Sequence, residues 1–275
     1  MSQKLLVFHL LFILMFSGEI PAQESHKKVI LPQDYQKHFD KYGVKGSFVA
    51  YDLKKNTTFF YDEKRCNTRF TPASTFKIFN SLVGLETGVI PDTSYIIPWD
   101  GVKRGNYAPW NRDNSLKSAF KYSVVWYYQE LARRVGEDKM QKFFSQNKYG
   151  NESIDSLLDS FWLSDYGGKL RISQVEQIDF LEKLFKDELK FSRRNQQLVK
   201  GIMLVEEKDD YKLLGKTGMG SHDGVCYGWY VGWVEKGNDT YFFATNIESN
   251  DYKNIMSGGR KEITLAVLQD LGLIK

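Results

Sequence analysis

The sequence predicts a mixed α/β fold of the α+β kind, in which an antiparallel sheet is flanked by helices and a helical block is inserted between two β-rich ends. Runs of β-branched and aromatic residues occur at about 47–61 and again at 211–246. Between them, residues 116–191 have mostly helical periodicity. The first two runs are separated only by residues 52–56, and strands joined so closely pair antiparallel. We therefore expect both ends of the chain to share one sheet.

In the first part of the chain, residues 47–51 and 57–61 are expected to form a hairpin around a turn that is rich in Lys, Asp and Asn. Thr71-Pro72 then opens a strongly apolar helix that runs to about Glu86, because proline is favoured in the first turn of a helix. Residues 91–115 contain Pro, Gly, Asn and several aromatic residues without a clear period. They predict a long ordered loop, and long loops are commonly functional.

The second part alternates from helices to strands and ends in a helix. The expected helices are 124–135, 172–189, 193–205 and 260–271, and the expected strands are 211–214, 225–235 and 241–246. We expect residues 23–275 to form a single domain, whose sheet part covers about 23–100 and 193–275 and whose helical part covers about 101–192.

Composition excludes several classes of protein. The chain has 275 residues, of which 42% are hydrophobic and 15% aromatic, so it can bury a large core. Its net charge is only +4 and its basic residues alternate with acidic ones, so no nucleic-acid partner is expected. Two cysteines and four histidines exclude a disulfide-rich scaffold and a cysteine-based zinc site, and no metal is expected.

The N-terminus has the pattern of a secretory signal peptide. Lys4 precedes an apolar run, 5–16, that is too short to span a bilayer as a helix. Cleavage after Ala22 is expected, which would leave an exported, periplasmic or secreted chain with no stable membrane span. The alternative is an uncleaved N-terminal anchor. Export permits a disulfide between Cys66 and Cys226, but the sequence favours the alternative of two small, buried, unpaired cysteines.

One serine and one lysine are candidates for nucleophilic chemistry. Ser74 and Lys77 stand three apart on the apolar helix and hence on one face, where a neutral lysine can act as the base for a serine. Spacing alone is weak evidence, since Ser25/Lys28, Ser118/Lys121 and Ser145/Lys148 share it. The surroundings of Ser74 differ, because its helix is apolar almost all round and is therefore expected to bury Lys77. The alternative is a capping serine beside a lysine that extends to solvent. His9, His26, His38 and His222 lie in polar or leader segments and are expected to be passive.

Two further motifs follow along the chain. Ser123-Val-Val125 stands at a helix start, and Lys216-Thr217-Gly218 closes the predicted strand 211–214. On an edge strand, a cation, a hydroxyl and a glycine backbone could together bind a substrate carboxylate that lies beside the strand. Either motif alone is commonplace.

Together, the three motifs resemble those of the serine penicillin-recognising superfamily, which carries S-x-x-K, then S-x-N or S-x-V, then K-T-G. The fuller resemblance is to class D, oxacillinase-type, β-lactamases and extends from about residue 30 to the C-terminus. It is carried by Pro72-Ala-Ser-Thr-Phe-Lys77, Ser123-Val-Val125, Tyr149-Gly-Asn151, Phe161-Trp162-Leu163 and Gly258-Gly-Arg260, besides the K-T-G motif. The resemblance implies the fold of D,D-peptidases and β-lactamases, and hydrolysis of β-lactam antibiotics, which gives resistance.

The resemblance also implies catalytic roles. Ser74 would attack the β-lactam carbonyl and become an acyl-enzyme. Lys77 would be N6-carboxylated by CO₂ or bicarbonate and act as the general base, with no other cofactor. Ser123, assisted by Lys216, would pass a proton to the leaving nitrogen.

Other residues would bind the substrate or support Lys77. Thr217 and Arg260 would hold the substrate carboxylate, with Gly218 alongside, and the N–H groups of Ser74 and Met219 would form the oxyanion hole. The Trp162 indole would donate to the carbamate on Lys77, and Val125 would close off its pocket. The Tyr149-Gly-Asn151 motif is expected to shape the floor of the site.

Three other functions are compatible with parts of this pattern: the sensor domain of a β-lactam receptor, a penicillin-binding D,D-peptidase, and a binding protein with an inactive site. The complete set of Ser74, Lys77, Ser123 and Lys216 favours an enzyme. Tyr107 and Trp110 are expected at the mouth of the cleft. Ser221 stands where some carbapenem-hydrolysing members have a methionine, so carbapenem hydrolysis is in doubt. A monomer or a homodimer is expected.

Overall fold

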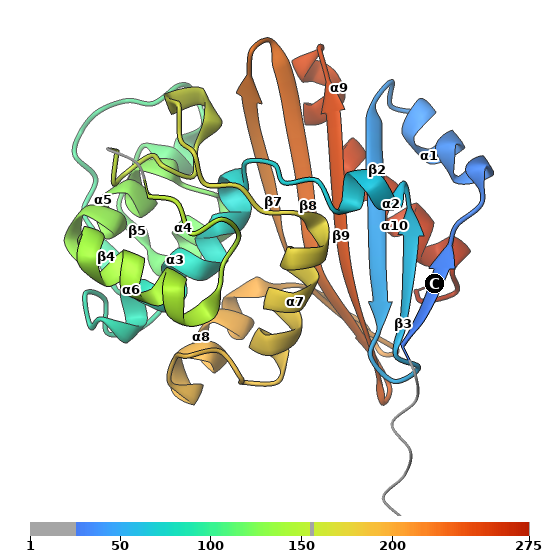
Figure 1. The fold of residues 1–275 in the computed structure, drawn as a ribbon. Helices are drawn as coiled ribbons and strands as arrows, with labels where there is room; N and C mark the ends of the chain where they lie inside the picture. The colour runs from blue at the N-terminus through green and yellow to red at the C-terminus, as the bar shows by residue number, and fades with distance from the viewer. Residues whose placement is uncertain (1–25, 155–156, 275) are drawn as a thin grey trace, which may run out of the picture.

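The computed structural model describes residues 26–154 and 157–274, and within them one large sheet joins the two ends of the chain (Figure 1). Seven strands follow the order β1-β3-β2-β9-β8-β7-β6. They are β1 (Lys27–Ile30), β2 (Lys45–Asp52), β3 (Thr57–Tyr61), β6 (Leu204–Glu207), β7 (Lys212–His222), β8 (Val225–Lys236) and β9 (Asp239–Ser249). β2 pairs antiparallel with β9 along its whole length, which confirms the shared sheet.

Helices lie on both sides of this sheet. They are α1 (Gln36–Asp40), α2 (Glu63–Cys66), α3 (Lys77–Glu86), α4 (Leu116–Lys121), α5 (Val125–Val135), α6 (Glu137–Asn147), α7 (Gln174–Phe185), α8 (Arg193–Met203), α9 (Tyr252–Met256) and α10 (Gly259–Asp270). α9 and α10 pack on β8 and β9, with α1 against α10. α7 packs on the other side against β9, and α3 is packed between α5 and α8 in the helical block on the left of Figure 1.

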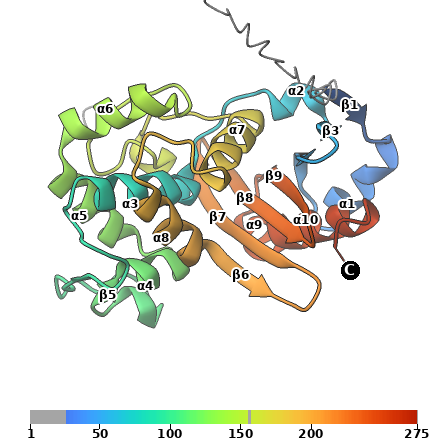
Figure 2. The same cartoon turned by 90° about the horizontal axis from the view of Figure 1, so that it is seen from below.

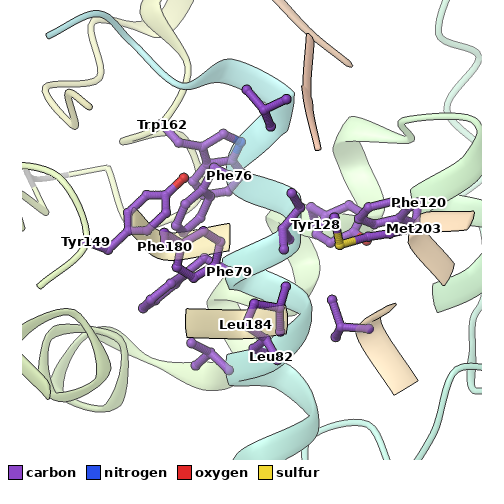
Figure 3. Close-up of a cluster of buried hydrophobic side chains, with 14 of the residues drawn as sticks. Phe76, Phe79, Leu82, Phe120, Tyr128, Tyr149, Trp162, Phe180, Leu184 and Met203 are labelled. Carbon is purple, nitrogen blue, oxygen red and sulfur yellow. The ribbon is translucent and has the colours of Figure 1, made fainter. Parts of the chain in front are cut away.

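The core is divided by the sheet, because successive side chains of a strand point to opposite faces. In β8, Trp229 and Trp233 belong to the cluster that includes the helical block, whereas Tyr230 and Val234 belong to the cluster beneath α10. Figure 3 shows the centre of the first cluster around α3, where Phe76 and Phe79 are fully buried among other aromatic rings. Full burial of a phenylalanine contributes about 1.5–3 kcal/mol, so this cluster fixes α3 firmly.

Several local expectations were wrong. β1 pairs parallel with β3, so the sheet is not wholly antiparallel. The predicted loop 91–115 contains a two-stranded sheet of β4 (Ile96–Ile97) and β5 (Asn114–Ser115). The predicted helix 193–205 ends at Met203, and Leu204 begins β6.

Cys66 and Cys226 are both buried free thiols, which corresponds to the second of the two alternatives for these cysteines. The predicted signal peptide and its cleavage site after Ala22 lie outside the described residues.

Candidate active site

The candidate nucleophile lies in a tight turn ahead of α3. Ser74 belongs to a 3-10 turn, Ala73–Phe76, and Lys77 is the first residue of α3. The Lys77 Nζ donates a hydrogen bond of 2.7 Å to the Ser74 Oγ. Ala73 has a φ of 48°, a conformation that costs a non-glycine residue on the order of 1–3 kcal/mol. The Thr75 hydroxyl stabilises this turn by donating to the Pro72 carbonyl at 2.7 Å.

Lys77 is completely buried, as predicted from its apolar helix. Loss of hydration, and secondly the positive charge of Lys216, lower the pKa of Lys77 well below its usual range. Its ammonium would lie 5.3 Å from the ring centre of Tyr128. A lowered pKa favours the neutral amine over the ammonium, and the neutral amine is the form that a base or a CO₂ acceptor requires.

A second serine–lysine pair lies on the other side of the site. The Lys216 Nζ donates to the Ser123 Oγ at 3.0 Å and to the Thr217 carbonyl at 2.9 Å. Ser123 precedes α5 with a φ of 55°, a second non-glycine residue in a left-handed conformation. Burial, and then the charges of Arg260 and Lys261, lower the pKa of Lys216 to about 7.

The strand that carries Lys216 is longer than predicted. Lys216-Thr217-Gly218 does not close a strand at 214 but lies in the middle of β7, which stays in register with β8 from Lys212 to His222. β6 covers the outer edge of β7 only as far as Leu214. A side chain at 218 would place its Cβ 3.0 Å from the Pro72 carbonyl oxygen. Glycine therefore lets β7 lie against the turn that holds Ser74.

These elements enclose a cleft of about 460 Å³, within the usual size of a ligand site. Seven of the predicted site residues line it: Ser74, Ser123, Val125, Thr217, Gly218, Met219 and Arg260. The other three, Lys77, Lys216 and Trp162, are buried around it. The structure thus brings most of the predicted site together on one surface and places both lysines directly behind its two serines.

Arg260 enters the cleft from α10. One guanidinium nitrogen donates to the Ile255 carbonyl at 2.8 Å, and the buried Nε has no hydrogen-bond partner in the described part of the chain. Burial lowers the pKa of Arg260. A partly buried guanidinium with an unused donor is suited to bind a carboxylate that enters the cleft.

Trp162 is fully buried beside the nucleophile turn, with its ring 5.1 Å from that of Phe76 (Figure 3). Its indole N–H has no hydrogen-bond partner among the residues that the structure describes. A buried donor without a partner is unfavourable, so this N–H is available to an acceptor that binds nearby.

The remaining predicted residues surround the cleft. Trp110 lines it, and Tyr107 lies beside Trp110 with about half of its surface exposed. The backbone N–H and hydroxyl of Ser221 both donate to Asp165 at 2.6 Å. Tyr149 packs against Phe79 and takes a structural position at the base of the site.

Sequence reasoning missed five residues that line the cleft: Arg104, Trp126, Gln129, Asp165 and Tyr166. Val125 and Gln129 stand four apart on α5, a helical spacing that could have indicated Gln129 once Val125 was chosen. Asp165 and Tyr166 belong to a 3-10 turn just after Trp162, and Arg104 to the long loop. Their sequence positions carry no comparable signal, because turns and loops have no fixed period.

Within residues 26–154 and 157–274, no three His, Cys, Asp or Glu side chains are grouped so that they could hold a metal ion.

Comparisons with known proteins identify the family. The model of the penicillin-binding protein transpeptidase domain matches residues 23–269. A probable β-lactamase of Bacillus subtilis strain 168, YbxI, is 43% identical over 229 residues, which are 83% of this chain and 82% of the relative. The crystal structure of the class D β-lactamase YbXI from Nostoc matches 87% of this chain and 99% of its own, with 42% identity and a TM-score of 0.82. The chain belongs to the class D β-lactamases.

The fold, the family and the enzyme class predicted from the sequence are therefore confirmed. This class D β-lactamase is also similar to the C-terminal domain of the BlaR penicillin receptor of Bacillus licheniformis. The two are 33% identical with a TM-score of 0.84, over 91% of this chain and 99% of the receptor domain.

Proposed function

We propose that this class D β-lactamase hydrolyses penicillins and related β-lactams through an acyl-enzyme on Ser74, with carboxylated Lys77 as the general base. The observation that carries the proposal is the pairing of two serines with two buried lysines in one cleft. Lys77 contacts Ser74 at 2.7 Å, and Lys216 contacts Ser123 at 3.0 Å. Each serine is thus in hydrogen-bond reach of its own lysine, and both serines line the same cleft.

Acylation begins when the Ser74 hydroxyl gives its proton to Lys77 and its oxygen bonds to the β-lactam carbonyl carbon. The ring C–N bond then breaks, and the nitrogen takes a proton from the Ser123 hydroxyl, which Lys216 replaces. The backbone N–H groups of Ser74 and Met219 would stabilise the carbonyl oxygen as it becomes negative. Before deacylation, Lys77 must pass the proton that it took from Ser74 on to Lys216, so that both lysines regain their starting states. In deacylation, Lys77 takes a proton from water, the water oxygen bonds to the ester carbonyl carbon, and Lys77 returns that proton to the Ser74 oxygen as the ester C–O bond breaks.

Carboxylation of Lys77 is supported by two features of its surroundings. Its lowered pKa makes the neutral amine available, and only the neutral amine adds CO₂. The resulting anion would need hydrogen-bond donors in an apolar site, and the partnerless Trp162 indole N–H is one. Val125 lines the neighbouring cleft wall and would limit the access of water.

Substrate binding follows from the charges around the cleft. Thr217, Gly218 and Met219 provide a strand edge along which the β-lactam would lie, and Arg260 would bind its carboxylate. Production of such an enzyme would confer resistance to the antibiotics that it hydrolyses.

The proposed location is outside the cytoplasmic membrane, because of the signal-like N-terminus with expected cleavage after Ala22. In the part of the chain that the structure describes, no helix has the length and apolar character that crossing a membrane requires. The expected oligomeric state remains a monomer or a homodimer.

A β-lactam sensor is the second candidate function, since the BlaR receptor domain has a closely similar structure. A sensor and an enzyme would share acylation of Ser74 but differ in deacylation. Turnover therefore separates them, whereas labelling by a penicillin does not.

The test is hydrolysis of a chromogenic cephalosporin by purified protein, with and without added bicarbonate. The enzyme gives many turnovers for each molecule, a sensor gives one stoichiometric burst, and a D,D-peptidase prefers a peptide ending in D-Ala-D-Ala. Ser74→Ala should abolish both turnover and covalent labelling. Ser118→Ala is the matched control, because Ser118 has the same spacing to a lysine but its hydroxyl accepts from the backbone N–H of Ser115, the N-cap of α4. Labelling that survives in Ser74→Ala but not in Ser118→Ala would place the nucleophile elsewhere.

A further inference from the structure

A second groove lies next to the catalytic cleft, along the outer edge of β7. It has a volume of about 520 Å³ and is lined by Gly215, Lys216 and Thr217, of which Thr217 also lines the cleft. The other walls come from α4, the end of α8, β6 and the start of α10. Figure 2 shows β6 at the edge of the sheet beside β7, and pairing between these strands ends at Leu214. The groove lies next to the part of β7 that β6 leaves uncovered.

The groove is basic. Lys117 and Lys121, one turn apart on α4, and Lys261 of α10 line it with exposed side chains, and none of its lining residues is acidic. Among the residues that the structure describes, these three lysines take part in no ion pair with a carboxylate. The neighbouring carboxylate of Glu206 already accepts from the Tyr211 hydroxyl at 2.8 Å and pairs with Lys208 at 3.0 Å. Lys261 also lowers the pKa of Glu206 through its charge, as the last-named of several causes, but forms no ion pair with it, so most of the positive charge of the three lysines is left for an anion from outside.

A buried hydroxyl without a partner points to the same place. Tyr230 lines the groove with only 1% of its surface exposed, and its hydroxyl has no hydrogen-bond partner in the described part of the chain. Its ring lies so close to Gly215 that a Cβ there would come within 2.9 Å of it. The Lys261 Nζ lies 5.9 Å from the centre of the same ring. An acceptor in the groove would satisfy this hydroxyl, and burial without one is unfavourable.

One wall of the groove is apolar. Leu204 and Val205 of β6 line it, each with 45% of its surface exposed, and Ile202 and Phe120 lie among the other lining residues. Exposed aliphatic side chains next to unpaired lysines match a ligand that has both a charged and an apolar part.

We propose that this groove binds a small anionic amphiphile, in which a sulfate, phosphate or carboxylate group carries a short alkyl or aryl tail. The headgroup accepts hydrogen bonds from Tyr230 and from the lysines of α4 and α10, and the tail lies on Leu204 and Val205. Binding at this site does not depend on the hydrolytic reaction, so a protein without β-lactamase activity would still show it.

The test is calorimetric titration of the full chain with octyl sulfate below its micelle concentration. Inorganic sulfate provides the charge without the tail, and octyl glucoside provides the tail without the charge. The variant Lys121→Gln/Lys261→Gln removes two exposed groove lysines, and Lys45→Gln/Lys139→Gln removes two exposed lysines elsewhere for the same change in net charge. Tyr230→Phe removes only the hydroxyl, and thermal melts check that each variant is folded.

We expect saturable one-to-one binding of octyl sulfate, weakened at least about tenfold in Lys121→Gln/Lys261→Gln because contacts to a charged group are lost. Tyr230→Phe should weaken it severalfold, and Lys45→Gln/Lys139→Gln should leave it unchanged. Three results would overturn the proposal: no saturable binding, equal weakening by both lysine pairs, or octyl glucoside binding as tightly as octyl sulfate. If inorganic sulfate binds as tightly as octyl sulfate, the proposal that the ligand has an apolar tail is wrong.

Discussion

The site contains two buried lysines, Lys77 and Lys216, and the partly buried Arg260, and no carboxylate in the described part of the chain shifts the pKa of any of them. Desolvation is the main cause that lowers the pKa of Lys77, Lys216 and Arg260 alike. Charges in such positions are unfavourable for folding unless a ligand or a modification compensates them. Substitution of one of these three residues, or removal of the group that compensates its charge, should therefore change activity or stability measurably.

Arg260→Ala should raise the KM for penicillins by roughly ten- to a hundredfold, the equivalent of one lost charge-assisted contact. The effect on kcat should be smaller, because the substrate carboxylate keeps its charge throughout the reaction and the contact contributes equally to ground and transition states. Steady-state kinetics with benzylpenicillin measure both constants. Lys253→Ala, an exposed cation of the neighbouring α9, is the control. A fall in kcat at constant KM would contradict this role of Arg260.

Trp162→Phe should make turnover dependent on added bicarbonate, since it removes the indole N–H and keeps most of the packing. Rates measured over a series of bicarbonate concentrations, and the ¹³C signal of a carbamate, give two readouts. The matched control is Trp233→Phe, which also removes a buried indole, one that donates to Glu235 at 2.8 Å. If both variants need bicarbonate equally, the effect comes from lost packing. If neither does, Trp162 does not stabilise a carbamate.

At the scale of elements, the distance between β7 and the nucleophile turn determines the shape of the cleft. A Cβ at 218 would meet the Pro72 carbonyl at 3.0 Å and the Thr75 methyl at 3.2 Å, so one element must move by a few tenths of an ångström. Gly218→Ala should therefore lower kcat/KM roughly tenfold while the fold is retained, because small displacements of catalytic groups are costly.

The control for this substitution is Gly201→Ala in α8, where a new Cβ meets nothing within 4 Å. Pre-steady-state acylation rates should fall only in Gly218→Ala. Unchanged acylation in that variant would show that the turn and the strand adjust to each other without loss of alignment.

Periodicity predicted the elements with strong patterns and failed where side chains are small or exposed. The hairpin of β2 and β3 was predicted because aromatic and β-branched residues alternate there. β7 was cut short at Leu214, since Gly215, Gly218 and Gly220 interrupt any apolar pattern and pairing with β8 alone continues the strand. β1 was missed because all of its residues are exposed.

The site was predictable to the extent that it consists of spaced motifs. A spacing of three on an apolar helix indicated the contact of Lys77 with Ser74, whereas the roles of Ser123 and Lys216 came from the resemblance to class D β-lactamases. The positive φ angles of Ala73 and Ser123 could not be predicted, because tertiary packing imposes them against local preference. Asp165 reaches Ser221 only through the folding of a turn onto β7.

At the scale of the whole molecule, the site lies where the helical block meets the sheet. Ser74 and Ser123 come from the block, whereas Lys216 and Arg260 come from β7 and α10. Because strands from both ends of the chain complete the sheet, the cleft can form only when the chain has folded as a whole. Stability and activity are therefore linked through the same buried groups.

Lys216 makes the free energy of unfolding depend on pH. Its pKa is about 7 in the folded state, against 10.5 for an ordinary lysine. Below pH 7 both folded and unfolded states hold the proton, and the full penalty of burial is present. Above pH 7 the folded state alone loses the proton. The free energy of unfolding should therefore rise by up to about 1.4 kcal/mol per pH unit from this residue.

The measurement is urea unfolding at pH 7, 8 and 9 of the parent, Lys216→Met and Lys212→Met, without bicarbonate. The pH range stops at 9 because burial raises the pKa of Cys66 from 9.0 to about 12. Above pH 9 only the unfolded state loses the Cys66 proton, which favours unfolding. Lys77 acts in the same direction as Lys216, and the main cause that lowers its pKa, burial, is kept in all three proteins, whereas the smaller effect of the Lys216 charge is lost in Lys216→Met. Lys212 is exposed on the same strand, and Glu207 raises its pKa, so Lys212→Met should keep the parent's slope. Lys216→Met should lose part of that slope. If the free energy of unfolding of Lys216→Met rises with pH as steeply as that of the parent, Lys216 does not titrate near neutral pH in the folded protein.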